Sequence, residues 1–264
     1  MKIFYKDEAV SMHAFILKLK LQGHLLSKYC YCGRLDPMAS GKVLFLEDTE
    51  CAKMEEYLSC DKEYTFDICC GISTDTDDIL GIIDEINLDT LNTFDTPMDN
   101  HSQNALYMNI QQLIQKNTQQ YHKFSAFQVK KDGKRVNLCE LSKQKQLGSI
   151  DIPSKKVTVY SITQLNKKIV DFKYYTSIIK DKIHTFKDPN NYYRKKEIEQ
   201  QWNDVYNSVS NKSMFHLISY TYKIKVSSGF YIRQFVADLK KMCRFPLMVL
   251  NIHRTQILKD GIIY

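Results

Sequence analysis

The chain has 264 residues, which is enough for one large domain or two small ones. Hydrophobic residues make up 44% and charged residues 25%, so the composition excludes a disordered chain, and no apolar run is long enough to span a membrane. The formal net charge of +7 is compatible with a polyanionic partner, and the N-terminus lacks the apolar core of a signal peptide, so we expect an intracellular, cytoplasmic protein without membrane contact.

The first predicted elements are a short strand at residues 2–5 and a helix at residues 11–21. The helix is indicated by apolar residues at helical spacing, with Ser11 as its N-cap. Residues 33–41, which we call the Asp36 box, read G-R-L-D-P-M-A-S-G, and the apolar run at 43–46 predicts a buried strand. Glycine and proline permit or restrict unusual backbone angles, so the box predicts a turn.

Asp36 is the one carboxylate of the Asp36 box. A carboxylate held on a rigid turn beside a core strand is well placed for chemistry on a bound ligand. Asp before Pro also commonly caps a turn, and from this stretch alone that interpretation has the stronger claim. Both interpretations stay open until the rest of the chain is considered.

A helix, a strand and a polar loop are predicted next. Residues 50–58 have the apolar spacing of a helix, and residues 62–68 alternate as a half-buried strand with Tyr64 on the inner face. The loop at residues 71–81 reads G-I-S-T-D-T-D-D-I-L-G. Its glycines and short polar residues predict a tight turn that hydrogen-bonds to itself.

We expect no metal site in this chain. The acidic loop lacks the Gly at the sixth position and the Glu at the twelfth that a calcium-binding EF-hand requires. The eight cysteines include no C-x-x-C pair, which is the spacing typical of zinc sites. We expect free thiols in a reducing compartment.

The middle of the chain contains a predicted helix at residues 106–115, a predicted strand at 157–162 and a dense basic cluster between them. The cluster consists of Lys130, Lys131, Lys134 and Arg135. Contact with RNA phosphates and a solvated loop are about equally favoured interpretations of this cluster.

Residues 167–212 are rich in Tyr, Lys and Asn. We interpret this range as an insertion that packs on the main domain. Aromatic residues beside cations can contact RNA by stacking and charge, but a solvated elaboration is the more common outcome.

The last strong pattern runs from residue 220 to residue 239. Alternation at residues 220–226 predicts a strand, residues 227–231 predict a turn, and the residues after them predict a helix that carries Arg233 near its start. The chain continues to the segment I-H-R-T at residues 252–255.

Four of these segments resemble the TruB-type pseudouridine synthases. The Asp36 box resembles the family's G-x-L-D-P-x-A-[TS]-G box, and residues 62–81 resemble its K-x-Y strand and G-x-x-T-D-T-x-D-x-x-G loop. Residues 227–239 resemble S-K-G-T-Y-I-R-x-x-x-x-D-L, and residues 252–255 resemble L-R-R-T. The box also resembles the G-R-L-D motif of the RluA and RsuA families, but the T-D-T loop is TruB-like, and four anchors in order favour that family.

The resemblance implies an α/β (α+β) fold, with a mostly antiparallel mixed sheet flanked by helices, in a single catalytic domain over residues 1–264. It implies isomerisation of an RNA uridine to pseudouridine, with the T-loop uridine 55 of tRNA as the expected target. RNA is the implied partner, the reaction requires no cofactor or metal, and we expect a monomer.

The resemblance also implies roles for individual residues. Asp36 is the expected nucleophile, since a carboxylate suits cleavage of a glycosidic bond by attack at ribose C1′ or at the base. Arg233 is expected to keep Asp36 ionised and oriented through its charge and forked geometry. Tyr64 is expected to stack on the base and to help remove the C5 proton. The residues expected to bind substrate in the pocket are Tyr31, Tyr231 and Ile252.

Departures from the family pattern leave alternatives open. Tyr31 stands where the family has His, the K-P-x-G-x-x-S segment keeps only Lys6 and Ser11, and we expect no C-terminal PUA domain because the chain ends at Tyr264. A synthase for another RNA is one alternative, and a catalytically silent RNA-binding protein or RNA chaperone is another. Retention of all three expected catalytic residues argues against a silent protein. A guide-RNA-dependent synthase is less favoured, because that assembly depends on the PUA domain.

Overall fold

The computed structural model describes residues 1–87, 100–148, 150–209, 216–243 and 245–264. Its central sheet has the strand order β1-β3-β13-β4-β12-β11, with β2 paired to β3 and β14 paired to β13. These strands are β1 (Lys2–Lys6), β2 (Tyr29–Cys32), β3 (Ala39–Glu47), β4 (Asp61–Cys70), β11 (Val159–Asp171), β12 (His216–Val226), β13 (Leu247–Lys259) and β14 (Ile262–Ile263). The pair β3–β13 is parallel and the other pairs of this sheet are antiparallel.

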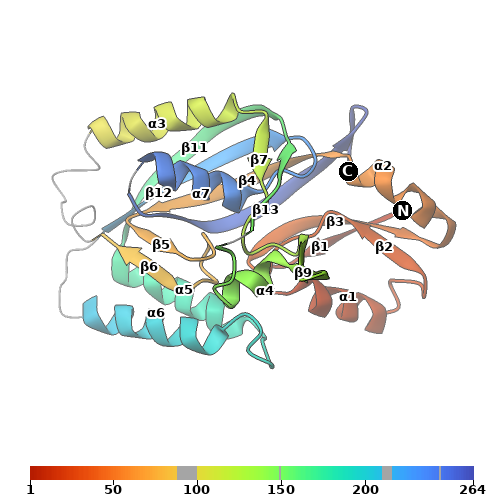
Figure 1. The fold of residues 1–264 in the computed structure, drawn as a ribbon, viewed down its shortest axis with the longest axis horizontal. Coiled ribbons are helices and arrows are strands. Elements are labelled where there is room, and N and C mark those ends of the chain that lie inside the picture. Colours follow the sequence, from red (N-terminus) through yellow and green to blue (C-terminus); the bar gives the residue numbers. More distant parts are fainter. Residues whose placement is uncertain (88–99, 149, 210–215, 244) are drawn as a thin grey trace.

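Helices cover both faces of this sheet (Figure 1). One face carries α3 (Asn100–Ile114) and α7 (Ile232–Cys243), and the other carries α5 (Phe172–Thr185) and α6 (Lys195–Val209). The alternation of β4 divides the two cores, because Phe66 packs with α7 while Cys69 packs with α5 and α6. The prediction of a mostly antiparallel mixed sheet flanked by helices is confirmed.

The remaining elements surround this framework. They are α1 (Met12–Leu21), the 3-10 helix η1 (Asp48–Lys53), α2 (Met54–Leu58), α4 (Leu138–Lys143) and the strand pairs β5 (Ile72–Thr74) with β6 (Ile83–Ile86), β7 (Thr118–Gln120) with β10 (Ser154–Lys156), and β8 (Gln128–Lys131) with β9 (Lys134–Asn137). No helix in the described part of the chain is long and apolar enough to cross a membrane.

Most local predictions are confirmed, including Ser11 as the N-cap, whose hydroxyl accepts from the backbone N–H of Ala14. The uniform helix predicted at residues 50–58 is wrong in its first half. That half lies in η1, and only Met54–Leu58 is α-helical. Glu47 and Glu50 form a capping box at the start of η1. Short 3-10 turns are frequent at the N-termini of helices.

The predicted insertion at 167–212 contains the end of β11, α5 and α6, while its residues 210–212 lie outside the described residues. Its two helices bury one face against the sheet. Trp202 and Ile179 are at most 1% exposed and pack in one cluster with Met248 and Leu250 of β13. The range therefore shares a core with the central sheet, and its origin as an insertion stays a prediction.

Candidate active site

The Asp36 box leads from β2 into β3, and its last residues pair with β13. Gly41, with φ +119°, lies opposite Arg254 in the parallel pair. A Cβ at Gly41 would lie 2.3 Å from the backbone oxygen of Arg254, so the box can approach β13 this closely only with glycine there. Asp36 is thereby held at the point where the sheet's one parallel pair begins.

Lys6 holds the Asp36 box through hydrogen bonds to its backbone. Its Nζ donates to the carbonyl oxygens of Pro37 (3.1 Å) and Ala39 (2.5 Å), and its side chain is fully buried. Burial lowers the pKa of Lys6 to about 8, although the charge of Asp36 opposes that shift. Lys6 was one of only two matches in the N-terminal segment, and the structure gives it a direct role in shaping the turn of Asp36.

Arg233 of α7 contacts Asp36 directly. Its Nε donates to Asp36 Oδ2 at 2.7 Å, while the Asp36 side chain keeps 35% of its surface exposed. Desolvation raises the pKa of Asp36, but the charge and hydrogen bond of Arg233 outweigh it and hold that pKa below its ordinary value. Asp36 is therefore an ionised carboxylate that a ligand can still reach.

The guanidinium of Arg233 is held on all three nitrogens. Nη1 donates to Thr76 O (3.2 Å) and lies 3.3 Å from His122 Nδ1, and Nη2 donates to Phe124 O (3.3 Å). Only Nε hydrogen-bonds to Asp36, so the expectation of a forked contact with that carboxylate is wrong. The Nη1 and Nη2 atoms, which would complete the fork, instead donate to the polar loop at Thr76 and to Phe124.

Asp78, which the sequence placed only within a polar loop, is a second carboxylate beside Arg233. Its Oδ2 lies 3.6 Å from Arg233 Nε, and its Oδ1 accepts from the Thr76 hydroxyl and the Leu80 backbone N–H. Burial raises the pKa of Asp78 to about 6, against the opposing charge of Arg233. Two carboxylates with different pKa values thus share one arginine.

Replacing Asp78 by Asn is expected to raise the free energy of unfolding at pH 7.5 by roughly 1–3 kcal/mol, because ionised Asp78 is desolvated in the folded state. A folded pKa above the unfolded value means that the penalty sets in as pH rises from about 4 and is complete above about 6. Thermal and urea unfolding of both proteins across pH 3.5–8 would measure it. The stability difference should vanish below pH 4, and an equal difference at every pH would contradict this origin.

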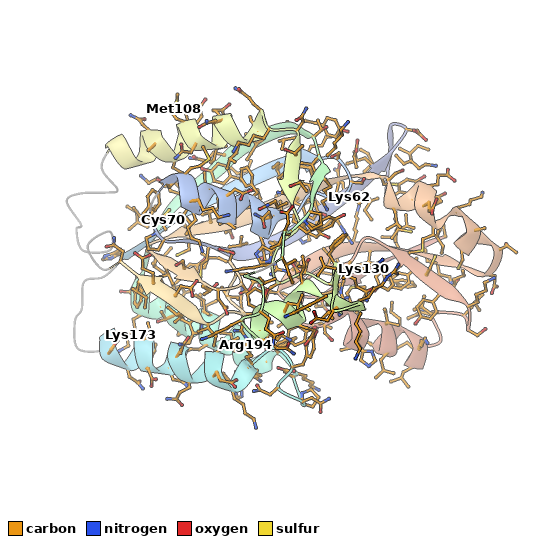
Figure 2. All side chains as sticks on the ribbon, viewed as in Figure 1. Lys62, Cys70, Met108, Lys130, Lys173 and Arg194 are labelled. Carbon is orange, nitrogen blue, oxygen red and sulfur yellow. The ribbon has the colours of Figure 1, made fainter. Side chains whose placement is uncertain are left out.

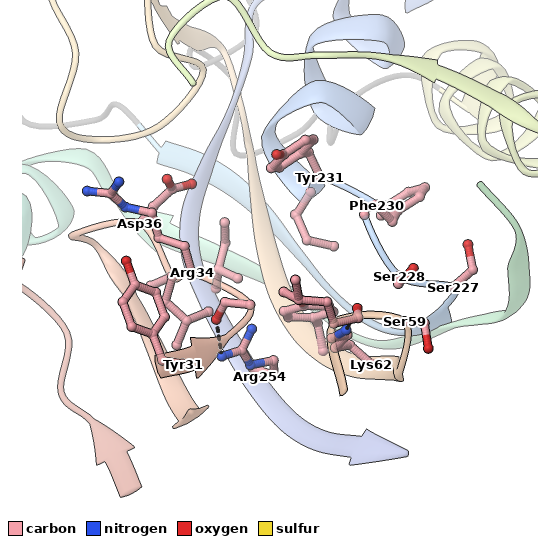
Figure 3. Close-up of a pocket in the computed structure, with 18 of the residues that line it drawn as sticks. Tyr31, Arg34, Asp36, Ser59, Lys62, Ser227, Ser228, Phe230, Tyr231 and Arg254 are labelled. Carbon is pink, nitrogen blue, oxygen red and sulfur yellow. Dashed lines mark hydrogen bonds between the residues drawn. The ribbon is translucent and has the colours of Figure 1, made fainter. Parts of the chain in front are cut away.

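Asp36 lines a cavity of about 1000 Å³ together with Tyr64, Tyr231, Tyr31 and Ile252. Every residue that the sequence predicted for catalysis and the pocket therefore lines this cavity except Arg233, whose Nε hydrogen-bonds to the Asp36 carboxylate. Figure 3 shows Asp36 and Tyr231 toward one end of this cavity and Lys62 and Arg254 toward another.

Strand register explains how the distant segments meet. Gly41 of β3 pairs with Arg254 of β13, Arg254 pairs with Tyr64 of β4, and Tyr64 pairs with Ile224 of β12. The turn after β12 then leads into α7 and delivers Tyr231. Its backbone is held by two hydrogen bonds with the Gln119 side chain.

A second cavity of about 620 Å³ also contains Asp36. It shares Arg34, Asp36 and Tyr231 with the first cavity, and the cations that it adds are Lys143, Arg194 and Arg233. Residues 192–194 belong to the range predicted as an insertion, so part of that range borders the site. Asp36 stands between the two cavities.

The basic cluster lies on the β8–β9 hairpin, where Figure 2 shows Lys130. Lys130, Lys134 and Arg135 are exposed, and Lys131 donates to the Gln146 side chain (2.7 Å). None of the four lines either cavity. The contact of these four residues with RNA therefore stays a prediction.

The predicted free thiols are confirmed for all eight cysteines. In the part of the chain that the structure describes, no three His, Cys, Asp or Glu side chains form a group able to hold a metal ion. Beside Lys6 and Asp78, the residue that sequence reasoning missed is His122, which lies in none of the four segments that resemble the family.

The model of the TruB family pseudouridylate synthase (N terminal domain) matches residues 19–182, which is more than half of the chain. This chain belongs to the TruB family. The match covers the Asp36 box, Tyr64 and the polar loop, and it continues into the range predicted as an insertion.

Two curated TruB relatives are named tRNA pseudouridine synthase B, one from Trichormus variabilis and one from Nostoc sp.. Each is 31% identical to this chain over 157 residues, covering 60% of this chain and 46% of the relative. The chain thus spans about half the length of the curated relatives it matches.

Two solved structures align over 97% of this chain at 12% identity. One is an H/ACA RNP bound to a substrate RNA containing 2'-deoxyuridine, with a TM-score of 0.44 and 47% of that chain covered. The other is a Cbf5-Nop10-Gar1 complex, with a TM-score of 0.47 and 48% covered.

Proposed function

We propose that this protein isomerises a uridine of RNA to pseudouridine and that its target is the T-loop uridine 55 of tRNA. The observation that carries the proposal is the ionised Asp36, held by Arg233 and exposed in a cavity lined by Tyr64 and Tyr231. Family membership supports the reaction, and the names of the curated relatives support tRNA as the substrate.

The reaction breaks the bond from uracil N1 to ribose C1′, turns the base and joins C5 to C1′, while the C5 proton is lost and N1 gains one. Asp36 is the proposed nucleophile, at C1′ or at the base, and its lowered pKa keeps it ionised for that attack. Arg233 holds the carboxylate without blocking it, because only Asp36 Oδ2 is engaged.

The other cavity residues receive supporting roles. Tyr64 stacks on the uracil and assists removal of the C5 proton, while Tyr231, Ile252 and Tyr31 enclose the base. Burial raises the pKa of Tyr231 to about 12, with the charge of Asp36 adding to the shift, so its ring enters the site as a neutral phenol. A uridine stacked in folded RNA must be flipped into this cavity, at a cost of a few kcal/mol.

The direct test is to incubate the protein with unmodified tRNA and, separately, with total RNA, and to map pseudouridine in both. Conversion of uridine 55 in tRNA supports the full proposal. Pseudouridine only at sites in other RNAs supports the reaction and overturns the tRNA assignment. No pseudouridine in either sample, from folded protein, overturns the reaction.

A synthase for another RNA is the second candidate function, and Tyr31 favours it. The family's His at this position is replaced by a half-buried phenol ring that packs 5.9 Å from the Phe45 ring. Tyrosine can stack on a base but cannot exchange a proton at neutral pH as imidazole does. A Tyr31→His variant that converts tRNA faster than the wild type, and other RNAs more slowly, would support this candidate.

Replacing Lys130, Lys131, Lys134 and Arg135 by Ala is expected to weaken tRNA binding and to flatten the slope of log affinity against log salt by up to about four units. The rate at saturating RNA should change little, because phosphate contacts position the backbone without touching the reacting base. Binding titrations across a salt series and separate turnover measurements would show both effects.

A control for this variant removes two other exposed lysines, Lys168 and Lys173, of which Figure 2 shows Lys173 on another part of the molecule. If the four-residue variant keeps the wild-type affinity and slope, the basic cluster is a solvated hairpin. If the control loses as much slope per charge removed as the cluster variant, RNA contact is not specific to the hairpin.

A further inference from the structure

A chain of polar contacts, buried at its centre, runs from Lys240 of α7 to the Asp36–Arg233 pair. Lys240 Nζ donates to Asp77 Oδ1 (2.6 Å), Asp77 Oδ2 lies 3.1 Å from His122 Nε2, and His122 Nδ1 lies 3.3 Å from Arg233 Nη1. Asp77 is 2% and His122 1% exposed. Asp77 takes a position that the T-D-T loop pattern leaves open, and His122 lies outside the four segments that resemble the family.

The surrounding donors determine the tautomer of His122. Nδ1 receives the backbone N–H of Phe124 (3.1 Å) and faces Nη1 of Arg233, so it must carry the lone pair. The proton then lies on Nε2, which donates to Asp77. Burial, together with the charge of Arg233, lowers the pKa of His122 to about 4, and the imidazole is therefore neutral at pH 7.

His122 acts on two nitrogens of the guanidinium. It accepts from Nη1 directly, and it holds the N–H of Phe124, whose carbonyl oxygen accepts from Nη2. Thr76 O is the remaining acceptor of Nη1. Because a guanidinium is planar, fixing Nη1 and Nη2 also fixes the direction in which Nε points, and that direction is toward Asp36.

We propose that His122 is a positioning residue for the reaction: it orients Arg233 by accepting through Nδ1, and Asp77 holds it in the tautomer that this requires. The kinetic consequence rests on the proposed function, whereas the spectroscopic consequence does not.

Two substitutions separate the two sides of the imidazole. His122→Asn places an amide oxygen near the position of Nδ1 and keeps an acceptor for Arg233, while it loses Asp77. His122→Gln reaches the position of Nε2 and keeps a donor for Asp77, while it loses the acceptor for Arg233. Both leave Asp77 and Lys240 in place, and His13→Gln, on the exposed side of α1, is the matched control.

The first readout is NMR of the free protein. We expect the wild-type His122 to show the Nε2–H tautomer at pH 7, and the Arg233 Nε–H signal, assigned through its loss in Arg233→Lys, to exchange slowly with water. In His122→Gln this signal should shift and exchange faster, whereas in His122→Asn it should stay close to the wild-type position.

The second readout is kinetic. His122→Gln should lower kcat about tenfold with little change in KM, because it disturbs the reacting carboxylate and not RNA binding. His122→Asn should lose several-fold less, and His13→Gln should match the wild type. A structural role alone would make both His122 variants lose activity in proportion to their loss of thermal stability.

Three results would overturn the inference: the opposite tautomer or an imidazolium in the wild type at pH 7, an unchanged Arg233 signal in His122→Gln, or equal kcat losses in the two variants. If neither variant folds, the wild-type spectrum still decides. An inactive wild type with the expected spectra would overturn the proposed function and leave the positioning of Arg233 supported.

Discussion

Replacing Asp36 by Asn is expected to abolish pseudouridine formation while the protein stays folded. The amide is nearly the same size as the carboxylate, but it is not a nucleophile, so the loss should exceed about 10³-fold. Folding should survive because Asp78, 3.6 Å from Arg233, remains to balance the guanidinium. The measurements are pseudouridine formed at saturating RNA, thermal unfolding and RNA affinity.

Asp7→Asn is the matched control, because it removes the same charge from the protein and the Asp7 side chain is 66% exposed. Asp7→Asn should keep wild-type turnover, and Asp36→Asn should keep wild-type affinity for RNA. Turnover near the wild-type value in folded Asp36→Asn would show that the nucleophile is another group.

Replacing Arg233 by Lys is expected to lower the rate at saturating RNA roughly 100-fold, which corresponds to about one or two charge-assisted hydrogen bonds. The reason lies in the separate acceptors that hold the guanidinium. Arg233 donates to Asp36 through Nε, and its Nη1 and Nη2 atoms contact Thr76 O, His122 and Phe124 O. A lysine ammonium has three donors on one atom and cannot reach these separated acceptors together.

A second measurement on Arg233→Lys is the pH dependence of its turnover. A lysine would not keep the hydrogen bond from Arg233 Nε to Asp36, so the pKa of Asp36 should rise, and the acid limb of activity should move to higher pH. A pH series of turnover, with unfolding followed in parallel, would show the shift. Unchanged turnover and an unchanged acid limb would mean that Arg233 does not control Asp36.

The elements of this fold were largely predictable because their signals are local. Alternation of side chains along residues 62–68 and 220–226 specifies strands that bury one face, and both strands form as expected. Gly41 and Pro37 mark a turn through backbone geometry that each residue carries by itself. Where local signals compete, as in η1, the predicted element was wrong in part.

The reactive groups of this protein can be recognised in short motifs of the chain: the Asp36 box, Tyr64, Tyr231 and Arg233. How these groups act on one another depends on the folded arrangement. Arg233 meets Asp36 across 197 residues of chain and His122 across 111, and no local pattern encodes such contacts. The pKa values follow the same rule, because burial and neighbouring charges, which set them, exist only once the chain has folded.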